Sequence, residues 1–194
     1  MSATYAEFLA TKRRVFPGVG ITPPTLSPKL FDWQAAVVRW ALRKGKAAVF
    51  ADCGLGKSFM QVSWAAALNV PTIAFAPLVV GEQTVKEAKK LGVTMRYAAD
   101  QSAAGEAPLV ITNYERLHKF DLSRYQAVVL DESSILKSFN GATRTALIEA
   151  CRDVPYRLCC TATPSPNDIA ELANHAEFLG LIDAARIPGD LVRP

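Results

Sequence analysis

The chain has 194 residues, half of them apolar, which is enough for one compact domain with a buried sheet. The formal net charge of +4 comes from 22 basic and 18 acidic residues that are interspersed, so a nucleic-acid partner is permitted but not required. The four cysteines form no CxxC pair and the two histidines lie far from any cysteine cluster, which argues against a zinc site. Apolar runs are too short to span a bilayer and no signal peptide is recognisable, so we expect a cytoplasmic, reduced protein without a membrane partner.

The first predicted elements are a helix within the first sixteen residues and a loop rich in proline and glycine that extends to residue 29. Residues 32–44 have apolar side chains at helical spacing, which predicts an amphipathic helix capped by Asp32. Its apolar stripe consists of Trp33, Val37, Trp40 and Ala41. Gln34 is expected outside this stripe, and a solvated Gln34 without a function is one interpretation of the residue.

Short apolar runs predict buried strands at 47–51, 72–76, 109–112, 127–131 and 157–161, with 94–98 as a weaker candidate. Helical patterns lie between them at 57–68, 81–91, 113–120 and 142–151. Strands that alternate with helices predict a doubly wound α/β fold, with a mainly parallel sheet between two helical layers. We expect this domain to cover residues 30–182 and residues 183–194 to form a tail or linker.

The segment AVFADCGLGKS, residues 48–58, is an apolar strand, a glycine turn and a Lys-Ser pair that opens a helix. This is the context of a P-loop, or Walker A motif, and predicts binding of a nucleoside triphosphate, most simply Mg-ATP. We expect Lys57 to contact phosphate oxygens and Ser58 to ligate Mg²⁺. Ala51 replaces the first glycine of the full pattern, so a strand-to-helix turn without a ligand is the alternative.

Backbone groups of the loop complete the predicted phosphate site. Gly54 and Gly56 allow N–H groups to approach phosphates closely, and the helix N-terminus adds partial positive charge. Cys53 and Leu55 are expected to contribute backbone N–H groups in the same way.

Two adjacent acids, Asp131 and Glu132, follow the apolar run at 127–130. One carboxylate can hold Mg²⁺ and the other can orient and deprotonate an attacking water, although both acids could simply end a strand and cap a helix. A third segment, Thr161-Ala162-Thr163-Pro164, closes another predicted strand. Because the carboxyl ends of parallel strands form the ligand face, we expect the three segments to meet there.

In the order Gln34, ADCGLGKS, LDES and TATP, residues 30–181 resemble the first RecA-like lobe of superfamily-two helicases. The segments LFDWQ, FAPLVV, ITNYERL, LDESSILKS and TATPSPND are closest to Swi/Snf-like translocases and phage-type DEAD/DEAH helicases. The resemblance implies a RecA-like P-loop NTPase lobe and ATP hydrolysis of the helicase type with Mg²⁺. It also implies a bacterial or phage origin and a nucleic-acid partner, with DNA favoured over RNA.

The resemblance also assigns individual roles. It places Gln34 at the adenine edge, with which an amide can form two hydrogen bonds. It gives Lys57, Ser58, Asp131 and Glu132 the phosphate, magnesium and water-activating roles described above. Thr161 and Thr163 would link the nucleotide site to the nucleic-acid face, and the segments that resemble nucleic-acid contacts contain Pro77, Thr112 and Lys137.

Two pairs of residues are less readily assigned. Ser133 and Ser134 replace the Ala-His or Ala-Asp that follows the acids in this superfamily, and we expect them to lie beside magnesium. His118 and His175 have no partner at motif spacing, so both are expected to be surface or capping residues.

Helicases that translocate have a second RecA-like lobe whose arginines contact the γ-phosphate. Residues 177–194 have no room for such a lobe, so we expect an isolated lobe or fragment. It would bind ATP and hydrolyse it slowly or not at all until a second lobe, in cis or in trans, completes the site. The alternative is a nucleotide-regulated binding module without motor activity. A small-molecule kinase is disfavoured because no arginine-rich lid follows the acidic strand.

Overall fold

The computed structural model describes residues 18–137, 142–164 and 171–181. Within these ranges six strands form one parallel sheet with the order β1-β6-β5-β2-β4-β3. The strands are β1 (Lys46–Phe50), β2 (Thr72–Ala76), β3 (Arg96–Tyr97), β4 (Leu109–Asn113), β5 (Ala127–Asp131) and β6 (Tyr156–Thr161). Every predicted strand is therefore confirmed, and the weaker candidate at 94–98 contributes only the two residues of β3.

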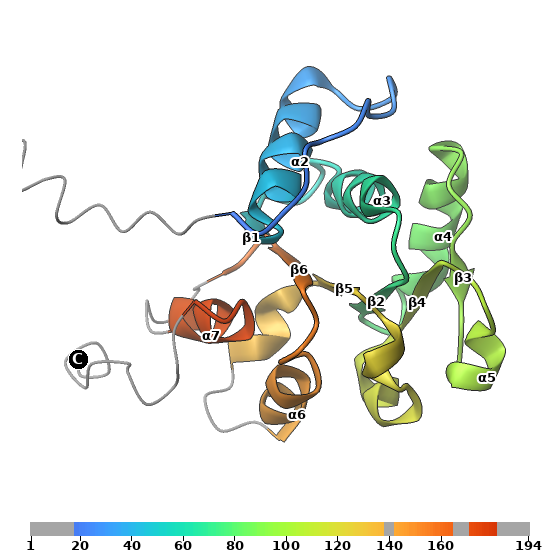
Figure 1. Cartoon of the computed structure of the whole chain (residues 1–194), viewed down its shortest axis with the longest axis vertical. Helices are drawn as coiled ribbons and strands as arrows, with labels where there is room; N and C mark the ends of the chain where they lie inside the picture. Colours follow the sequence, from blue (N-terminus) through green and yellow to red (C-terminus); the bar gives the residue numbers. More distant parts are fainter. Residues whose placement is uncertain (1–17, 138–141, 165–170, 182–194) are drawn as a thin grey trace, which may run out of the picture.

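Helices cover both faces of the sheet. The α-helices are α2 (Asp32–Lys44), α3 (Lys57–Leu68), α4 (Gly81–Lys90), α5 (Gln101–Ala104), α6 (Ala142–Ala150) and α7 (Glu171–Phe178). The 3₁₀ helices are η1 (Tyr114–Lys119), η2 (Leu122–Arg124) and η3 (Ser133–Lys137), so the helix predicted at 113–120 is of the 3₁₀ type. Figure 1 shows α2, α3 and α4 on one face and α5, α6 and α7 on the other, which confirms the three-layer α/β/α architecture. The predicted N-terminal helix lies outside the described residues.

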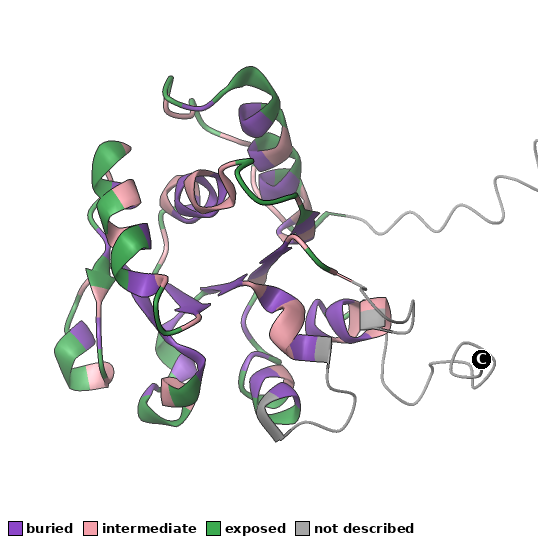
Figure 2. Ribbon diagram, turned by 180° about the vertical axis from the view of Figure 1, so that it is seen from behind, coloured by how far each residue is buried: buried purple, intermediate pink, exposed green. Residues whose placement is uncertain are grey.

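The core consists of two apolar clusters, one on each face of the sheet. One joins α2 and α3 to the sheet and contains Leu42, Met60 and Trp64, while the other contains Phe75, Leu130 and Leu147. Strands β2, β4 and β5 are buried along their whole length because helices cover both of their faces. Figure 2 shows this pattern as buried central strands surrounded by helices with exposed outer surfaces.

Helix α2 packs through a different stripe from the one predicted. Its buried residues are Gln34, Ala35, Val38, Ala41 and Leu42, whereas Trp33 and Trp40 are each 44% exposed. The small and branched residues allow α2 to approach α3 closely, so the bulky indoles lie at the rim. The predicted cap is also wrong, because Phe31 is the N-cap and Asp32 is the first helical residue.

Residues before the predicted domain boundary also pack on the lobe. The N–H groups of Val19, Gly20 and Ile21 donate to carbonyls of the last turn of α2, and Ile21 and Leu26 contact the core. The boundary at residue 30 remains a prediction. None of the described helices combines the length and apolar character needed to cross a bilayer.

A buried arginine joins β6 to α7. Arg157 is 5% exposed, and its guanidinium donates to the carbonyl oxygens of Val154 at 2.9 Å, Phe178 at 2.5 Å and Arg152. The Phe178 carbonyl belongs to the last turn of α7, where no further helical N–H is available. Arg157 therefore supplies donors to a helix end that the apolar core would otherwise leave unpaired.

Replacing Arg157 by Lys retains the charge but removes the planar set of donors, which leaves buried carbonyls unpaired. We expect a loss of about 3 kcal/mol in the free energy of unfolding, or roughly 6–12 °C in thermal melting. Arg124→Lys is the control, because Arg124 forms an exposed ion pair with Glu106 and its replacement should cost less than about 1 kcal/mol. Equal melting temperatures for the two variants would contradict a stabilising role for the hydrogen bonds that Arg157 donates to the end of α7.

Candidate nucleotide-binding site

Three segments leave the sheet side by side at its carboxyl edge. Strand β6 lies between β1 and β5, so Phe50 pairs with Thr161, and Asp131 pairs with Cys160. The loop after β1, the Thr161–Pro164 segment after β6 and the acid pair after β5 are thereby neighbours. The meeting of these segments, which was expected from the pattern of strands, is present in the structure.

Two glycines shape the loop after β1. Gly54 and Gly56 have φ angles of 82° and 72°, in the left-handed region that favours glycine. A Cβ at position 56 would also lie 2.5 Å from Nε2 of Gln34. Ala51 has no positive φ and continues the ladder, with its N–H 3.1 Å from the Thr161 carbonyl, which explains why glycine is not needed there.

The loop opens directly into α3. Gly56 is the N-cap and Lys57 the first helical residue, so the N–H groups of the first turn have no partner within the helix. Cys53 and Leu55 are exposed on the loop, and Ser58 is half-buried. The Lys57 ammonium donates to the carbonyls of Ala51 at 2.9 Å and Asp52 at 3.1 Å, which holds it over the loop.

Asp131 is 7% exposed at the end of β5. Its Oδ1 accepts hydrogen bonds from Nε2 of Gln61 at 2.7 Å and from the N–H of Glu132 at 3.1 Å. Burial raises the pKa of the Asp131 carboxyl above its ordinary value. Gln61 is not among the predicted site residues, and its signal in the sequence is a polar residue in an apolar helix, one turn after Lys57 and on the same face.

Glu132 joins the acid pair to the segment after β6. Its Oε1 accepts a hydrogen bond from the Thr161 hydroxyl at 2.6 Å, and that hydroxyl accepts one from the N–H of Thr163 at 3.0 Å. The φ of Glu132 is 53°, an uncommon left-handed conformation for a residue other than glycine. Tyr114, also missed, donates its hydroxyl to the Asp131 carbonyl at 2.6 Å, and burial raises the Tyr114 pKa well above its ordinary value.

Gln34 joins α2 to the loop. It is 4% exposed, so its interpretation as a solvated surface residue is wrong. Its Oε1 accepts from the Phe31 N–H and its Nε2 donates to the Leu55 carbonyl, both at 3.0 Å. An amide has two donor hydrogens and two acceptor lone pairs, so these two bonds use half of its hydrogen-bonding capacity.

The residues assigned to nucleic-acid contact differ in their surroundings. Pro77 is half-buried at the carboxyl end of β2, followed by the exposed Leu78 and Val79. The Thr112 side chain is fully buried in β4 and donates to the Ala98 carbonyl at 2.8 Å, and a contact of its segment with nucleic acid stays a prediction. Lys137 ends η3, and its side chain lies outside the described part of the structure.

The two histidines also differ. His118 is exposed, as expected, but the surface interpretation of His175 is wrong because α7 turns this residue inward and leaves it 2% exposed. Its Nε2 lies 3.1 Å from the hydroxyl of Ser133, which is itself fully buried. Ser134 is half-buried beside it. No sequence motif indicated the pairing of two residues 42 positions apart.

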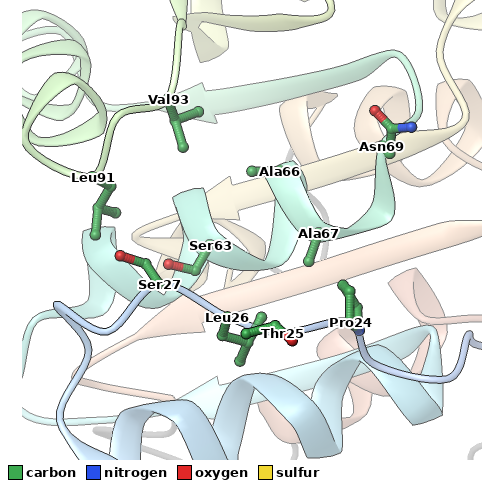
Figure 3. Close-up of a pocket in the computed structure, with 10 residues that line it drawn as sticks. All are labelled: Pro24, Thr25, Leu26, Ser27, Ser63, Ala66, Ala67, Asn69, Leu91 and Val93. Carbon is green, nitrogen blue, oxygen red and sulfur yellow. The ribbon is translucent and has the colours of Figure 1, made fainter.

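Among the hollows that the described residues line, one lies beside the loop after β1 and another lies away from it. A groove of about 380 Å³ runs beside the loop between α2 and β1, and its rim includes Trp33, Trp40 and Leu55. A second hollow of about 340 Å³ lies between residues 24–27, the second half of α3 and the segment 91–93 (Figure 3). It contains none of the predicted site residues, although the buried Ser63 hydroxyl on its wall has no hydrogen-bond partner among the described residues.

Comparison with known proteins identifies the fold. No protein-family model and no curated protein sequence matches this chain. The SWI2/SNF2 ATPase core of Sulfolobus solfataricus, solved in complex with dsDNA, superposes with a TM-score of 0.66 and 21% identity over 81% of this chain. The UvsW helicase of bacteriophage T4 gives 0.64 and 12% over 89%, and the Hef helicase domain of Pyrococcus furiosus gives 0.66 and 13% over 81%.

The chain shares the α/β fold of the ATPase core and helicase domains in these solved structures. At these identities the likeness establishes the fold and leaves the roles of individual residues to the geometry described above. The chain spans 37%, 64% and 38% of the three solved chains, less than two thirds of each.

The burial of Asp131 leads to a prediction about stability. Because the folded-state pKa is raised, the charged carboxylate destabilises the fold at neutral pH, and this cost disappears as the pH falls below the ordinary aspartate range. Asp131→Asn keeps an oxygen acceptor for both hydrogen bonds and removes the buried charge. We expect its melting temperature to rise by about 3 °C at pH 7, with the gain lost at pH 3. The control is the exposed Asp153→Asn, and a lower melting temperature for Asp131→Asn at pH 7 would contradict this account.

Proposed function

We propose that this chain is the ATP-binding lobe of a nucleic-acid-dependent ATPase of the helicase or translocase type. The observation that carries the proposal is the arrangement at the carboxyl edge, where the Lys57 loop, the Thr161 segment and the acid pair are neighbours. The 2.6 Å bond between Glu132 and Thr161 connects two of these segments directly. A structural turn without a ligand would not require a buried carboxylate and an ammonium at the same edge of the sheet.

The residues present fit Mg-ATP. The N–H groups at the start of α3, which have no partner within the helix, and the Lys57 ammonium suit phosphate oxygens. Gly54 and Gly56 give the backbone access to them. Asp131 and Ser58 supply the oxygen ligands that Mg²⁺ prefers, and the ion, when bound, would neutralise charge on the phosphates. Glu132 is half-buried and suited to accept a proton from the attacking water. Gln34 retains the hydrogen-bonding capacity to contact adenine.

The proposed partners are DNA, in preference to RNA, and a second RecA-like lobe. The superposable Sulfolobus core was solved with dsDNA, which favours DNA. A second lobe in cis or in trans would supply the arginine that stabilises the transferring phosphoryl group. The fraction of the three solved chains that this lobe spans is consistent with such a completion.

Lys57→Ala tests nucleotide binding. Loss of the ammonium should weaken binding of Mg-ATP by about 100-fold in calorimetric titration, since charge-assisted hydrogen bonds to phosphate are lost. Lys86→Ala, an exposed change on α4, is the matched control and should bind like wild type. Failure of the wild-type chain to bind Mg-ATP would remove the basis of the proposal.

Glu132→Gln tests turnover. The amide cannot accept the proton of the attacking water, so the ATPase rate in the presence of duplex DNA should fall by about 10²-fold or more while Mg-ATP affinity changes by less than about threefold. Glu149→Gln on the exposed side of α6 is the control. A wild-type chain that binds Mg-ATP but shows no turnover with DNA or RNA, even when a second RecA-like lobe is supplied, would favour a nucleotide-regulated binding module instead.

A further inference from the structure

A buried polar pair connects the acid pair to α7. The Ser133 hydroxyl is fully buried and lies 3.1 Å from Nε2 of His175, which is 2% exposed. The two elements that carry them, η3 and α7, also contribute Leu136 and Phe178 to one apolar cluster. Polar groups are disfavoured in such surroundings unless they are hydrogen-bonded, so the two side chains hold each other in place.

Ser133 directly follows the turn that carries Glu132. That turn has a left-handed backbone at Glu132, with φ 53°, which persists only where its surroundings hold it. On one side, Glu132 is fixed by its N–H bond to Asp131 and by the Thr161 hydroxyl on its carboxylate. On the other side, the next side chain along the backbone is fixed by His175.

His175 also contacts the strand that leads into the phosphate loop. Its ring meets the Phe50 ring edge to face, with centroids 5.4 Å apart and planes at 83°. Phe50 is the last residue of β1 and precedes Ala51, whose carbonyl accepts a hydrogen bond from Lys57. A single side chain of α7 thus contacts the residue before the loop and the residue after the acid pair.

Helix α7 is itself firmly anchored. Buried Arg144 of α6 donates from Nε to Asn174 at 3.1 Å and forms an ion pair with Glu177, and these residues flank His175 on α7. Arg157 holds the far end of the helix through the Phe178 carbonyl. Contacts at positions 174 and 177 and at the end of α7 therefore hold the part of the helix that carries His175.

We propose that His175 is a positioning residue that, through Ser133, ties the turn carrying Glu132 to α7. Nucleotide binding beside the acid pair is thereby transmitted to α7. This inference rests on the proposed nucleotide site, and no motif in the sequence assigns it. A purely structural pair would stabilise the fold equally with and without nucleotide, whereas the proposed link makes the state of α7 depend on the nucleotide.

The experiment measures hydrogen exchange by mass spectrometry in residues 131–136 and 171–181, with and without magnesium and a non-hydrolysable ATP analogue. In the wild type, the analogue is expected to slow exchange in both segments by about tenfold. Ser133→Ala and His175→Ala should bind the analogue within about threefold of wild type but lose its effect on residues 171–181. Their double variant should lose no more than either single variant, because each removes the same link.

Two further variants separate the link from general damage. His175→Gln retains a polar nitrogen near the position of Nε2 and should restore at least about half of the slowing in α7. It also keeps the test decisive if His175→Ala fails to fold. His118→Gln makes the same change at an exposed histidine and should behave as wild type. The link between Ser133 and His175 would be overturned if the analogue still slowed hydrogen exchange in α7 of Ser133→Ala. It would also be overturned if the wild type bound the analogue without slower exchange in α7. Either result would leave the proposed function intact. Absence of analogue binding would overturn the proposed function first.

Discussion

The site depends on the register of three parallel strands. β6 lies between β1 and β5, and pairing of Phe50 with Thr161 and of Cys160 with Asp131 sets where each loop begins. A slip of one residue would move a loop by about 3.3 Å and turn its side chains to the other face of the sheet. Apolar clusters on both faces of the sheet prevent such a slip, so the core fixes the relative positions of the polar residues.

Side-chain hydrogen bonds then refine what the register sets. Gln61 reaches from α3 to Asp131, Thr161 reaches Glu132 across the adjacent strand, and Gln34 reaches from α2 to the loop. Each bond joins elements that are far apart in the sequence, so the three strand ends behave as one polar layer. Two features of this layer oppose stability, namely the buried carboxylate of Asp131 and the left-handed backbone conformation of Glu132. Strain and buried charge of this kind concentrate at functional sites.

The sequence predicted the strands well because each is a short apolar run bounded by turn residues, and parallel pairing requires such runs. The loop could be predicted because Gly54 and Gly56 provide its left-handed turns and Lys57 begins the helix that follows, and these are local properties of the chain. The buried face of α2 was predicted wrongly. Trp33 and Val38 are both apolar but lie on different sides of the helix, so the apolar periodicity is compatible with either side being buried. The contacts of Gln61, Tyr114 and His175 were not predicted, because tertiary packing brings each side chain to its partner and no sequence motif marks the pair. The burial of Thr112 was not predicted because a motif position does not reveal that helices cover both faces of β4.

The position of Lys57 bears on the energetics of binding. Its ammonium already donates to two loop carbonyls, and Asp52 accepts from the neighbouring Cys53 N–H, so the loop satisfies part of its own polarity. A phosphate must therefore replace hydrogen bonds and does not simply fill free donors, which makes the net gain smaller than the sum of its contacts. What a phosphate adds, and neutral carbonyls cannot, is negative charge beside an ammonium and the start of a helix. The arrangement thus discriminates by charge more than by shape, which suits the nucleoside triphosphate that we propose as its ligand.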